Sequence, residues 1–498
     1  MSQQEPRCPF AAEPVYPRPA PYKKHFFWRL LKGLHSWFGL LSDVDFQIPI
    51  GSVQFLGLNL FLVNDPATVK RVMVDEVDDF PKHPYTLWIL EPLIGRAIFS
   101  VNGPEWARQR RLVDQAFQVA QLRRVLPQMQ GAVEAMVARL DAEIAAASTT
   151  PQHPAEPVTV EIDEAMTLVT ADVIVRTILS RPLEAAEAAG IFDAFARYQR
   201  RAGQALMLRF LRLPQDKLQA YLGRHARTIR GWIREAIDVR LSGEASQCFD
   251  QVPPSDAPQD LLQALIDARD PETGEAFSRE ELLDQVCFLF LAGHETSASS
   301  LGMAVYLLSC FPEAQARLRA EVLELLSAQT GAPEGPDRPL SFEDLRQLPY
   351  AAAVFNETLR LYPPVSFFIR ESQSEGELVD RRCPMRSLVT ISPWVVQRQQ
   401  GQWPQPHAFD PDRFLSDSGA SMALNAQNRQ LARDVWLPYG LGPRKCPGAA
   451  FALQEALLVL AELVRRYELL PAAGPAPDLV GRLTLRSRNG IRVQLRRL

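Results

Sequence analysis

One cysteine stands in a segment whose composition suits a charged sulfur. The stretch Leu437 to Ala456 reads LPYGLGPRKCPGAAFALQEA, with glycines and prolines crowded around Cys446. Glycines let the backbone turn tightly and let a flat ligand approach closely. A helical pattern starts at Gly448, so Cys446 lies just ahead of a helix N-terminus, where backbone N–H groups favour an anion. We expect this setting to lower the pKa of the thiol and to favour the thiolate, the form that binds metals.

The same segment resembles the haem-binding loop of cytochromes P450, whose usual pattern is Phe-Gly-x-Gly-x-Arg-x-Cys-x-Gly. Residues 439–448 of this chain read YGLGPRKCPG, so Tyr439 in place of Phe is the one departure. The resemblance implies that Cys446 binds the iron of heme b (iron protoporphyrin IX). It also places Tyr439 and Gly440 beside the cofactor. A tyrosine hydroxyl there could alter hydrogen bonding near the sulfur. A buried structural cysteine in a glycine-rich loop is the alternative.

A polar cluster interrupts the long apolar pattern of residues 279–310. Residues 292–297 read AGHETS, and polar groups inside an apolar helix are costly to bury. The His-Glu pair suggests the zinc-protease motif HExxH, but that motif needs a second histidine at position 298. Ala298 stands there, so the zinc-protease interpretation fails.

The cluster instead resembles the oxygen-binding helix of the same family. The resemblance implies that Gly293 leaves room for dioxygen and that Thr296 hydrogen-bonds water and the bound oxygen. It further implies that Glu295 relays protons from solvent. The alternative is that Thr296 only hydrogen-bonds back to its own helix.

An acid and two arginines match a further motif. Glu357 and Arg360 are three residues apart and therefore share one helix face. Such pairs are usually solvated surface contacts, but this one resembles the Glu-x-x-Arg pair of the family. Residues 411–414 read PDRF and resemble the segment that supplies a second arginine, here Arg413. The resemblance implies a buried structural triad, and breaking such a network costs several kcal/mol.

Four further residues resemble the groups that bind haem propionates. Trp106 and Arg110 lie four apart, as in the Trp-x-x-x-Arg pair of the family. Arg370 follows the Glu-x-x-Arg pair by ten residues, and Arg444 precedes the cysteine by two. A guanidinium binds a carboxylate in bidentate geometry.

The elements that must position these residues are mostly helical. Helical periodicity predicts helices, and short apolar runs between turn residues predict strands near the start. Asn489-Gly490 between alternating apolar runs predicts a hairpin. The fold class is therefore mainly α with small β-sheets, and the resemblance implies a cytochrome P450 fold with a triangular-prism helical core around haem. The predicted helices are 105–117, 122–147, 162–179, 216–241, 260–268, 279–310, 312–326, 350–361 and 448–467, and the predicted strands are 52–59 and 60–65.

Composition limits the other possibilities. The chain has 498 residues and a formal net charge of −4, which gives no pull toward nucleic acid. Its six cysteines are scattered without a CxxC pair, which argues against disulfides and zinc and favours a cytoplasmic protein.

We divide the chain into a Pro-rich tail with an amphipathic lead-in, residues 1–41, and a single catalytic domain, residues 42–498. Charges interrupt residues 26–41, so this segment does not span a membrane. It packs on the domain or makes peripheral contact with a membrane surface.

The resemblance implies a haem-thiolate monooxygenase that inserts one oxygen atom from O2 into an apolar small molecule. Electrons would come from a separate ferredoxin or flavodoxin, and the enzyme would be a monomer. Two alternatives stay open, a haem-thiolate peroxygenase or isomerase and a non-catalytic haem sensor or electron carrier. A basic docking patch is expected from Arg108, Arg111, Arg123, Arg124, Arg444 and Lys445. An apolar substrate pocket is expected from residues 85–99, 192–213 and 365–369 and from Phe290, Leu291 and Leu485.

Overall fold

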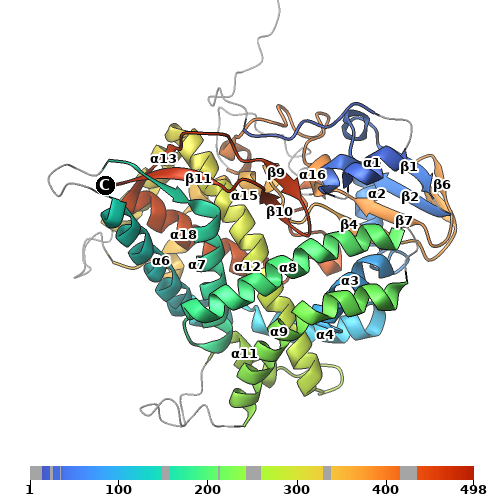
Figure 1. The fold of residues 1–498 in the computed structure, drawn as a ribbon, viewed down its shortest axis with the longest axis horizontal. Helices are drawn as coiled ribbons and strands as arrows, with labels where there is room; N and C mark the ends of the chain where they lie inside the picture. The colour runs from blue at the N-terminus through green and yellow to red at the C-terminus, as the bar shows by residue number, and fades with distance from the viewer. Residues whose placement is uncertain are drawn as a thin grey trace, which may run out of the picture.

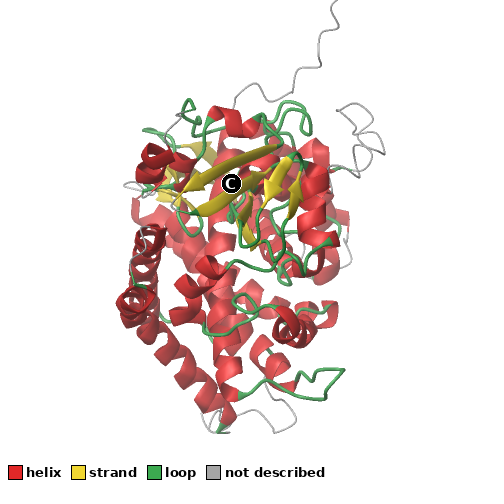
Figure 2. Ribbon diagram, turned by 90° about the vertical axis from the view of Figure 1, so that its right-hand side faces the viewer, coloured by secondary structure: helices red, strands yellow, loops and turns green. Residues whose placement is uncertain are grey.

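Helices make up most of the molecule, and the strands lie in its upper half in both views (Figure 1, Figure 2). The computed structural model describes residues 14–22, 26–33, 35–55, 57–147, 156–210, 214–242, 259–328, 338–415 and 434–498. The prediction of a mainly helical chain with small sheets is confirmed.

The α-helices follow the predicted ranges closely, and α3, α8 and several short helices are additional. Predicted helix 122–147 is divided at Val125 into α5 and α6. The bounds are α1 Phe26–Gly33, α2 Pro66–Lys70, α3 Pro84–Ile94, α4 Gly103–Ala116, α5 Val119–Arg124, α6 Leu126–Ala147, α7 Ile162–Leu179, α8 Ala185–Phe210, α9 Gln215–Leu241, α11 Leu261–Asp267, α12 Arg279–Cys310, α13 Pro312–Ala328, α14 Phe342–Leu345, α15 Pro349–Leu361, α16 Pro393–Val396 and α18 Ala449–Arg466.

Helix α12 runs through the middle of the helical part (Figure 1). It starts at a capping box, in which Ser278 and Glu281 each bond the other's backbone N–H, at 3.3 and 2.9 Å. Most of its residues are buried, as expected for a helix that is apolar on all sides. Phe288, Ala292 and Thr296 are only partly buried and recur every four residues. One face of α12 is therefore less covered by the protein than the rest of the helix.

The described residues form four small sheets, in the strand orders β1-β2-β7-β4, β3-β11-β8, β9-β10 and β5-β6. Strands β2 and β7 are parallel, and the remaining neighbours are antiparallel. The bounds are β1 Ile50–Phe55, β2 Leu58–Val63, β3 Val158–Glu161, β4 Phe368–Glu371, β5 Gly376–Leu378, β6 Arg381–Cys383, β7 Leu388–Ile391, β8 Tyr467–Pro471, β9 Leu479–Gly481, β10 Leu485–Ser487 and β11 Arg492–Arg497.

The hairpin predicted at Asn489-Gly490 is wrong. Gly490 does turn the chain, with φ of 77°, but the strands on either side do not pair with each other. Strand β10 pairs with β9, whereas β11 pairs with β3 and β8. The Asn489 side chain accepts a 2.7 Å hydrogen bond from the Asp478 backbone instead. Long-range pairing therefore outweighs the local turn signal.

The described part of residues 1–41 packs on the rest of the chain. The Tyr16 ring stacks on Trp394 with centroids 5.9 Å apart, and the hydroxyl of Tyr362 donates to the Val15 carbonyl at 2.7 Å. Trp37, in the 3-10 helix Trp37–Leu40, is buried. Residues 1–13, 23–25 and 34 lie outside the described residues. Tyr16 and Trp37 of this segment therefore pack on the rest of the chain, whereas Trp28 and Leu31 of α1 are 58% and 38% exposed.

Candidate active site

The loop around Cys446 is closed by backbone hydrogen bonds. The Cys446 amide donates to the Tyr439 carbonyl at 2.8 Å, and the Lys445 amide donates to the Gly442 carbonyl at 3.1 Å. Gly440 and Gly442 have φ of 74° and 68°, which side chains tolerate poorly. A Cβ on Gly442 would also lie 2.4 Å from the carbonyl oxygen of Met73. Helix α18 begins at Ala449, so Cys446 does precede a helix N-terminus.

The expected lowering of the Cys446 pKa is wrong. Burial by the surrounding loop raises the pKa of the thiol, and this effect exceeds the lowering by the Gly448 backbone and by the charges of Arg110 and Lys445. The residue is nonetheless exposed, so the protein around the sulfur crowds it without covering it.

Tyr439 is held beside this loop by aromatic packing. Its ring meets Trp436 edge-on, with centroids 5.8 Å apart. Its hydroxyl is buried and has no hydrogen-bond partner among the described residues. Burial and the neighbouring Cys446 raise the pKa of this hydroxyl, so it stays protonated.

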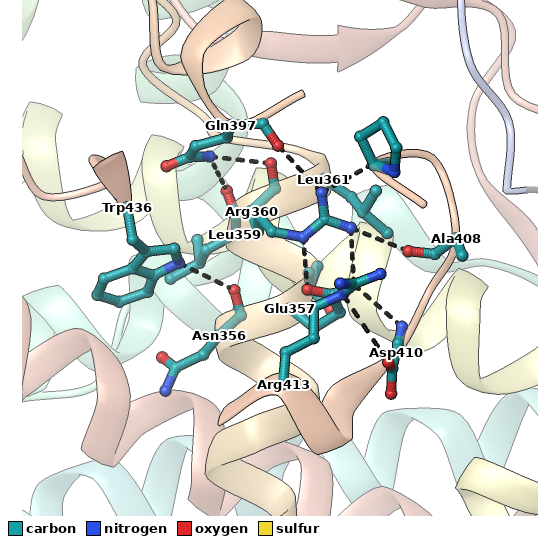
Figure 3. A network of polar contacts seen from close by, with 12 residues as sticks. Asn356, Glu357, Leu359, Arg360, Leu361, Gln397, Ala408, Asp410, Arg413 and Trp436 are labelled. Atoms are coloured by element: carbon teal, nitrogen blue, oxygen red, sulfur yellow. Dashed lines mark hydrogen bonds and ion pairs between the residues drawn. The ribbon is translucent and has the colours of Figure 1, made fainter. Parts of the chain in front are cut away.

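The structure brings Glu357, Arg360 and Arg413 together in the interior (Figure 3). One edge of the Arg360 guanidinium binds the acid: Nε and Nη2 donate to the Glu357 carboxylate at 2.6 and 2.7 Å. The Arg413 Nε lies 3.4 Å from the same carboxylate. All three side chains are 4% exposed or less, so these charges depend on one another for solvation.

Gln397 connects this triad to the cysteine loop, as Figure 3 shows in part. Its side-chain amide donates to the carbonyls of Leu359 and Arg360 at 3.1 and 2.9 Å. Its side-chain oxygen accepts a 2.6 Å bond from the Leu437 amide. The end of α15 and the start of the cysteine loop therefore share one buried amide.

Three cations converge where propionate groups were expected. Arg444 donates to the Phe80 carbonyl at 3.0 Å, and its guanidinium lies 5.6 Å from the Trp106 ring centroid. Arg370, on β4, forms an isolated β-bridge with Lys82. Sequence analysis missed Lys82. Its proximity to Arg370 and Arg444 arises only in the fold, because these arginines come from distant segments of the chain.

The protein partners of these cations are backbone carbonyls: Lys82 Nζ donates to the carbonyls of Ile98 and Phe99 at 2.7 and 2.8 Å. Burial, together with the charges of Arg444 and Arg370, lowers the pKa of Lys82 to about 6. Burial and Arg444 lower the pKa of Arg370 to about 10. The Nε atoms of both arginines are buried without a hydrogen-bond partner, and within the described residues none of the three cations forms an ion pair with an acid. A flat ligand with two carboxylates beside Cys446, as haem is, fits this arrangement.

Arg110 contacts the backbone of the cysteine loop. Its Nη1 donates to the Lys445 carbonyl at 2.5 Å, and its Nε pairs with Asp114 at 2.8 Å. Arg110 thus fixes the backbone immediately before Cys446. Trp106, one turn earlier on α4, is the residue of this pair that lies against Arg444.

On α12, Thr296 and Gly293 have distinct environments. The Thr296 hydroxyl donates to the Ala292 carbonyl at 2.6 Å, one turn back, and the side chain is only partly buried. A Cβ on Gly293 would lie 2.2 Å from Cδ1 of Ile174 on α7. The glycine is therefore required for the close approach of α12 and α7, a reason that sequence analysis did not give.

Glu295 points into a polar pocket of its own. Arg486 Nη2 lies 2.6 Å from one carboxylate oxygen, while Gln199 and Thr484 donate to the other at 2.6 and 2.9 Å. Burial raises the pKa of Glu295, but Arg486 and His294 lower it more, so its pKa is below the ordinary value. Sequence analysis missed these partners, which come from α8 and from the hairpin of β9 and β10.

Some of the residues that were expected to line an apolar pocket make aromatic contacts. Phe99 is 38% exposed and stacks on Phe288, with centroids 5.7 Å apart. Phe367 is partly buried and meets Trp37 edge-on at 4.8 Å. Phe290 belongs to the core instead, where it contacts Trp232 and His294. Residues 211–213 of the expected range lie outside the described residues.

Known proteins are similar to this chain in sequence and in fold. A family model described as Cytochrome P450 matches residues 14–491. Cyclooctatin synthase of Streptomyces melanosporofaciens is 31% identical over 398 residues, 78% of this chain and 77% of that protein. Cyclooctat-9-en-7-ol 5-monooxygenase of the same organism is 37% identical over 215 residues, 43% of each chain. A solved cytochrome P450DA heme domain, 22% identical, superposes with a TM-score of 0.77 over 97% of this chain and 98% of its own, which shows a shared fold.

Proposed function

The chain belongs to the cytochrome P450 family and is an oxidoreductase of the monooxygenase class, and we propose that it inserts one oxygen atom from O2 into an apolar small molecule with electrons from a separate protein. We propose further that Cys446 binds the iron of heme b and that Lys82, Arg370 and Arg444 bind its propionates. When bound, the haem supplies the activation of dioxygen, which thiolate ligation favours.

One observation carries the oxygen-activating function over the peroxygenase alternative. Glu295 and Thr296 are adjacent on α12, but Thr296 lies on the partly exposed face of the helix while Glu295 is buried among polar side chains. An alcohol at the partly exposed face can hydrogen-bond water and the bound oxygen, and an acid behind it can exchange protons. A peroxygenase has no need of this pair.

The variant Thr296→Ala tests this proposal. We expect electron uptake from NADH to continue while the fraction that appears in hydroxylated product falls at least several-fold. Hydrogen peroxide should account for the difference. Unchanged coupling would remove Thr296 from proton delivery. Turnover with hydrogen peroxide alone that equals turnover with a surrogate ferredoxin and its reductase would favour the peroxygenase alternative.

The proposed electron donor is a ferredoxin or flavodoxin, but the predicted basic patch is smaller than expected. Arg108 pairs with Glu281, Arg111 pairs with Asp270, and Arg123 pairs with Glu343. Arg444 is half-buried and donates to the Phe80 carbonyl. Of the six predicted residues, Arg124 and Lys445 are exposed and form no ion pair within the described segments.

The reduced patch makes a sharp prediction for the donor. Arg124→Glu should raise the KM for an acidic surrogate ferredoxin and weaken the dependence of that KM on salt. The paired and exposed Arg123 provides the matched control, since its charge is already offset by Glu343. Equal effects of Arg123→Glu and Arg124→Glu would show that docking does not use this surface as proposed.

The substrate class we propose is a largely hydrocarbon molecule, since Phe99, Phe288 and Phe367 supply aromatic surface. Two relatives carry names that refer to cyclooctatin and cyclooctat-9-en-7-ol, which makes cyclic hydrocarbon alcohols the first compounds to test. Substrate-induced spin shifts should be compared among such alcohols, fatty acids, steroids and aromatic compounds. A shift with fatty acids alone would contradict the cyclic-alcohol proposal.

The proposed setting is a monomer in the cytoplasm. Within the described residues, none of the helices combines the length and the apolar character that a membrane crossing requires. Size-exclusion chromatography and cell fractionation test both statements. A dimer, or recovery with the membrane fraction, would contradict them.

A further inference from the structure

We propose that Arg486 is a positioning residue for proton delivery, which holds the Glu295 carboxylate in its buried pocket and restrains it from turning toward the partly exposed face of α12. This inference rests on the proposed function, because it assigns a control to the same acid. It concerns Arg486 on strand β10, a residue to which the sequence analysis assigned no role.

The contacts around Glu295 form a closed set from three elements. Arg486 approaches from β10, with Nη2 2.6 Å from Oε1 and Nε 3.3 Å from Oε2. Thr484, next to the same strand, and Gln199, on α8, donate to Oε2 at 2.9 and 2.6 Å. His294 Nε2 lies 3.6 Å from Oε1. The carboxylate therefore has protein partners on both oxygens, and its side chain is only 7% exposed.

The backbone that carries Arg486 is fixed on two sides. The Leu485 amide donates to the Pro364 carbonyl at 3.0 Å, and the Leu485 carbonyl accepts a 2.6 Å bond from Ser299 on α12. At the other end of the hairpin, the Gly481 amide donates to the Ser36 hydroxyl at 2.9 Å. Because β10 is tied to α12 itself, the guanidinium keeps its register with Glu295.

The charges around Glu295 also indicate that Arg486 holds its carboxylate. The charged or titratable groups that face Glu295 are Arg486 and His294, while Gln199 and Thr484 are neutral. Burial alone would raise the pKa of Glu295, and the charge of Arg486 is the largest effect that opposes it. An ionised carboxylate bound to a guanidinium is a poor proton donor. Proton transfer must therefore await loosening of the Arg486 contact.

The first test needs no catalysis. In Arg486→Gln, Glu295 becomes a buried carboxylate without its cation, so its pKa should rise above the unfolded value. The unfolded state then binds fewer protons than the folded state near neutral pH, and folding stability falls as pH rises. We expect the melting temperature of the holoenzyme variant to drop further below the parent at pH 8 than at pH 5. The additional substitution Glu295→Gln should abolish this dependence on pH.

Controls separate charge from structure. Arg486→Lys keeps the cation and should restore most of the parent profile. Arg488→Gln removes a neighbouring arginine that is 60% exposed and pairs with Asp478, and should leave the profile unchanged. A melting-temperature gap that is the same at both pH values, or that persists in the Glu295→Gln background, would overturn the proposal.

The second test measures coupling with any compound that gives a spin shift. Arg486→Gln should change the ratio of product to hydrogen peroxide at least twofold while the spin shift is retained. In the Glu295→Gln background the same substitution should have no further effect on this ratio. An additive effect would show that Arg486 acts through another group. The melting data stand whether or not the enzyme turns over, so failure of the proposed function is distinguishable from failure of this inference.

Discussion

The amide of Cys446 donates a 2.8 Å hydrogen bond to the carbonyl of Tyr439, so the cysteine and the residue that departs from the family pattern close one loop. The tyrosine ring packs on Trp436, and its hydroxyl stays inside the protein. The backbone contact depends on neither ring chemistry nor hydroxyl. The loop can therefore keep its geometry with either aromatic residue.

Tyr439→Phe should for this reason leave the holoenzyme equally stable or more stable. A buried hydroxyl without a hydrogen-bond partner costs about 1–3 kcal/mol, and the substitution removes it while keeping the ring. Chemical denaturation followed by fluorescence measures the free energy of unfolding. A loss of more than about 1 kcal/mol would mean that the hydroxyl has a partner when haem is bound.

Glu357→Gln should destabilise the protein by about 3–5 kcal/mol, because two buried guanidinium groups lose their shared carboxylate. Purified variant should contain far less haem than the parent. Glu375→Gln is the matched control, since its pair with Arg382 is on the surface, and no measurable change is expected. Normal haem content in Glu357→Gln would refute a structural role for the triad.

Gly293→Ala should destabilise the protein by about 1–3 kcal/mol through overpacking against Ile174. The double variant Gly293→Ala with Ile174→Ala should recover part of this loss, because the clashing Cδ1 and Cγ1 atoms are gone. A double-variant cycle in thermal unfolding measures the coupling. Purely additive effects would show that Ile174 is not the obstacle.

Lys82→Met should speed the loss of haem to a haem acceptor, whereas Lys70→Met, at an exposed position, should not. In haem-free protein the folded pKa of Lys82 is about 6 against an ordinary 10.5. The unfolded state therefore binds more protons between these values, and stability should rise with pH across that window. Bound haem propionates should raise the pKa of Lys82, and stability should then depend less on pH across this window. Equal slopes with and without haem would contradict the propionate assignment.

Much of the fold follows from local sequence. The central helix has the predicted bounds, because its capping box and apolar length are local signals. Helix α3 was missed, and Pro92 within it breaks the usual pattern. The Asn489-Gly490 hairpin failed because strand pairing depends on β3, β8 and β9, which come from elsewhere in the chain.

Some residues of the site can likewise be predicted from the sequence, and others cannot. Cys446, Glu357 and Thr296 stand in motifs that can be read along the chain. Lys82 and Arg486 do not, since their importance comes from neighbours that only the fold brings near. The pKa direction of Cys446 was mispredicted because the helix-terminus argument omitted the burial of the thiol.

The account depends most on Cys446 as the ligand of the haem iron. The most direct measurement is the absorption spectrum of the reduced protein with carbon monoxide. We predict the red-shifted Soret band of thiolate ligation in the parent and its loss in Cys446→Ala. A band of the histidine-ligated type in the parent, or an unchanged red-shifted band in Cys446→Ala, would contradict the assignment.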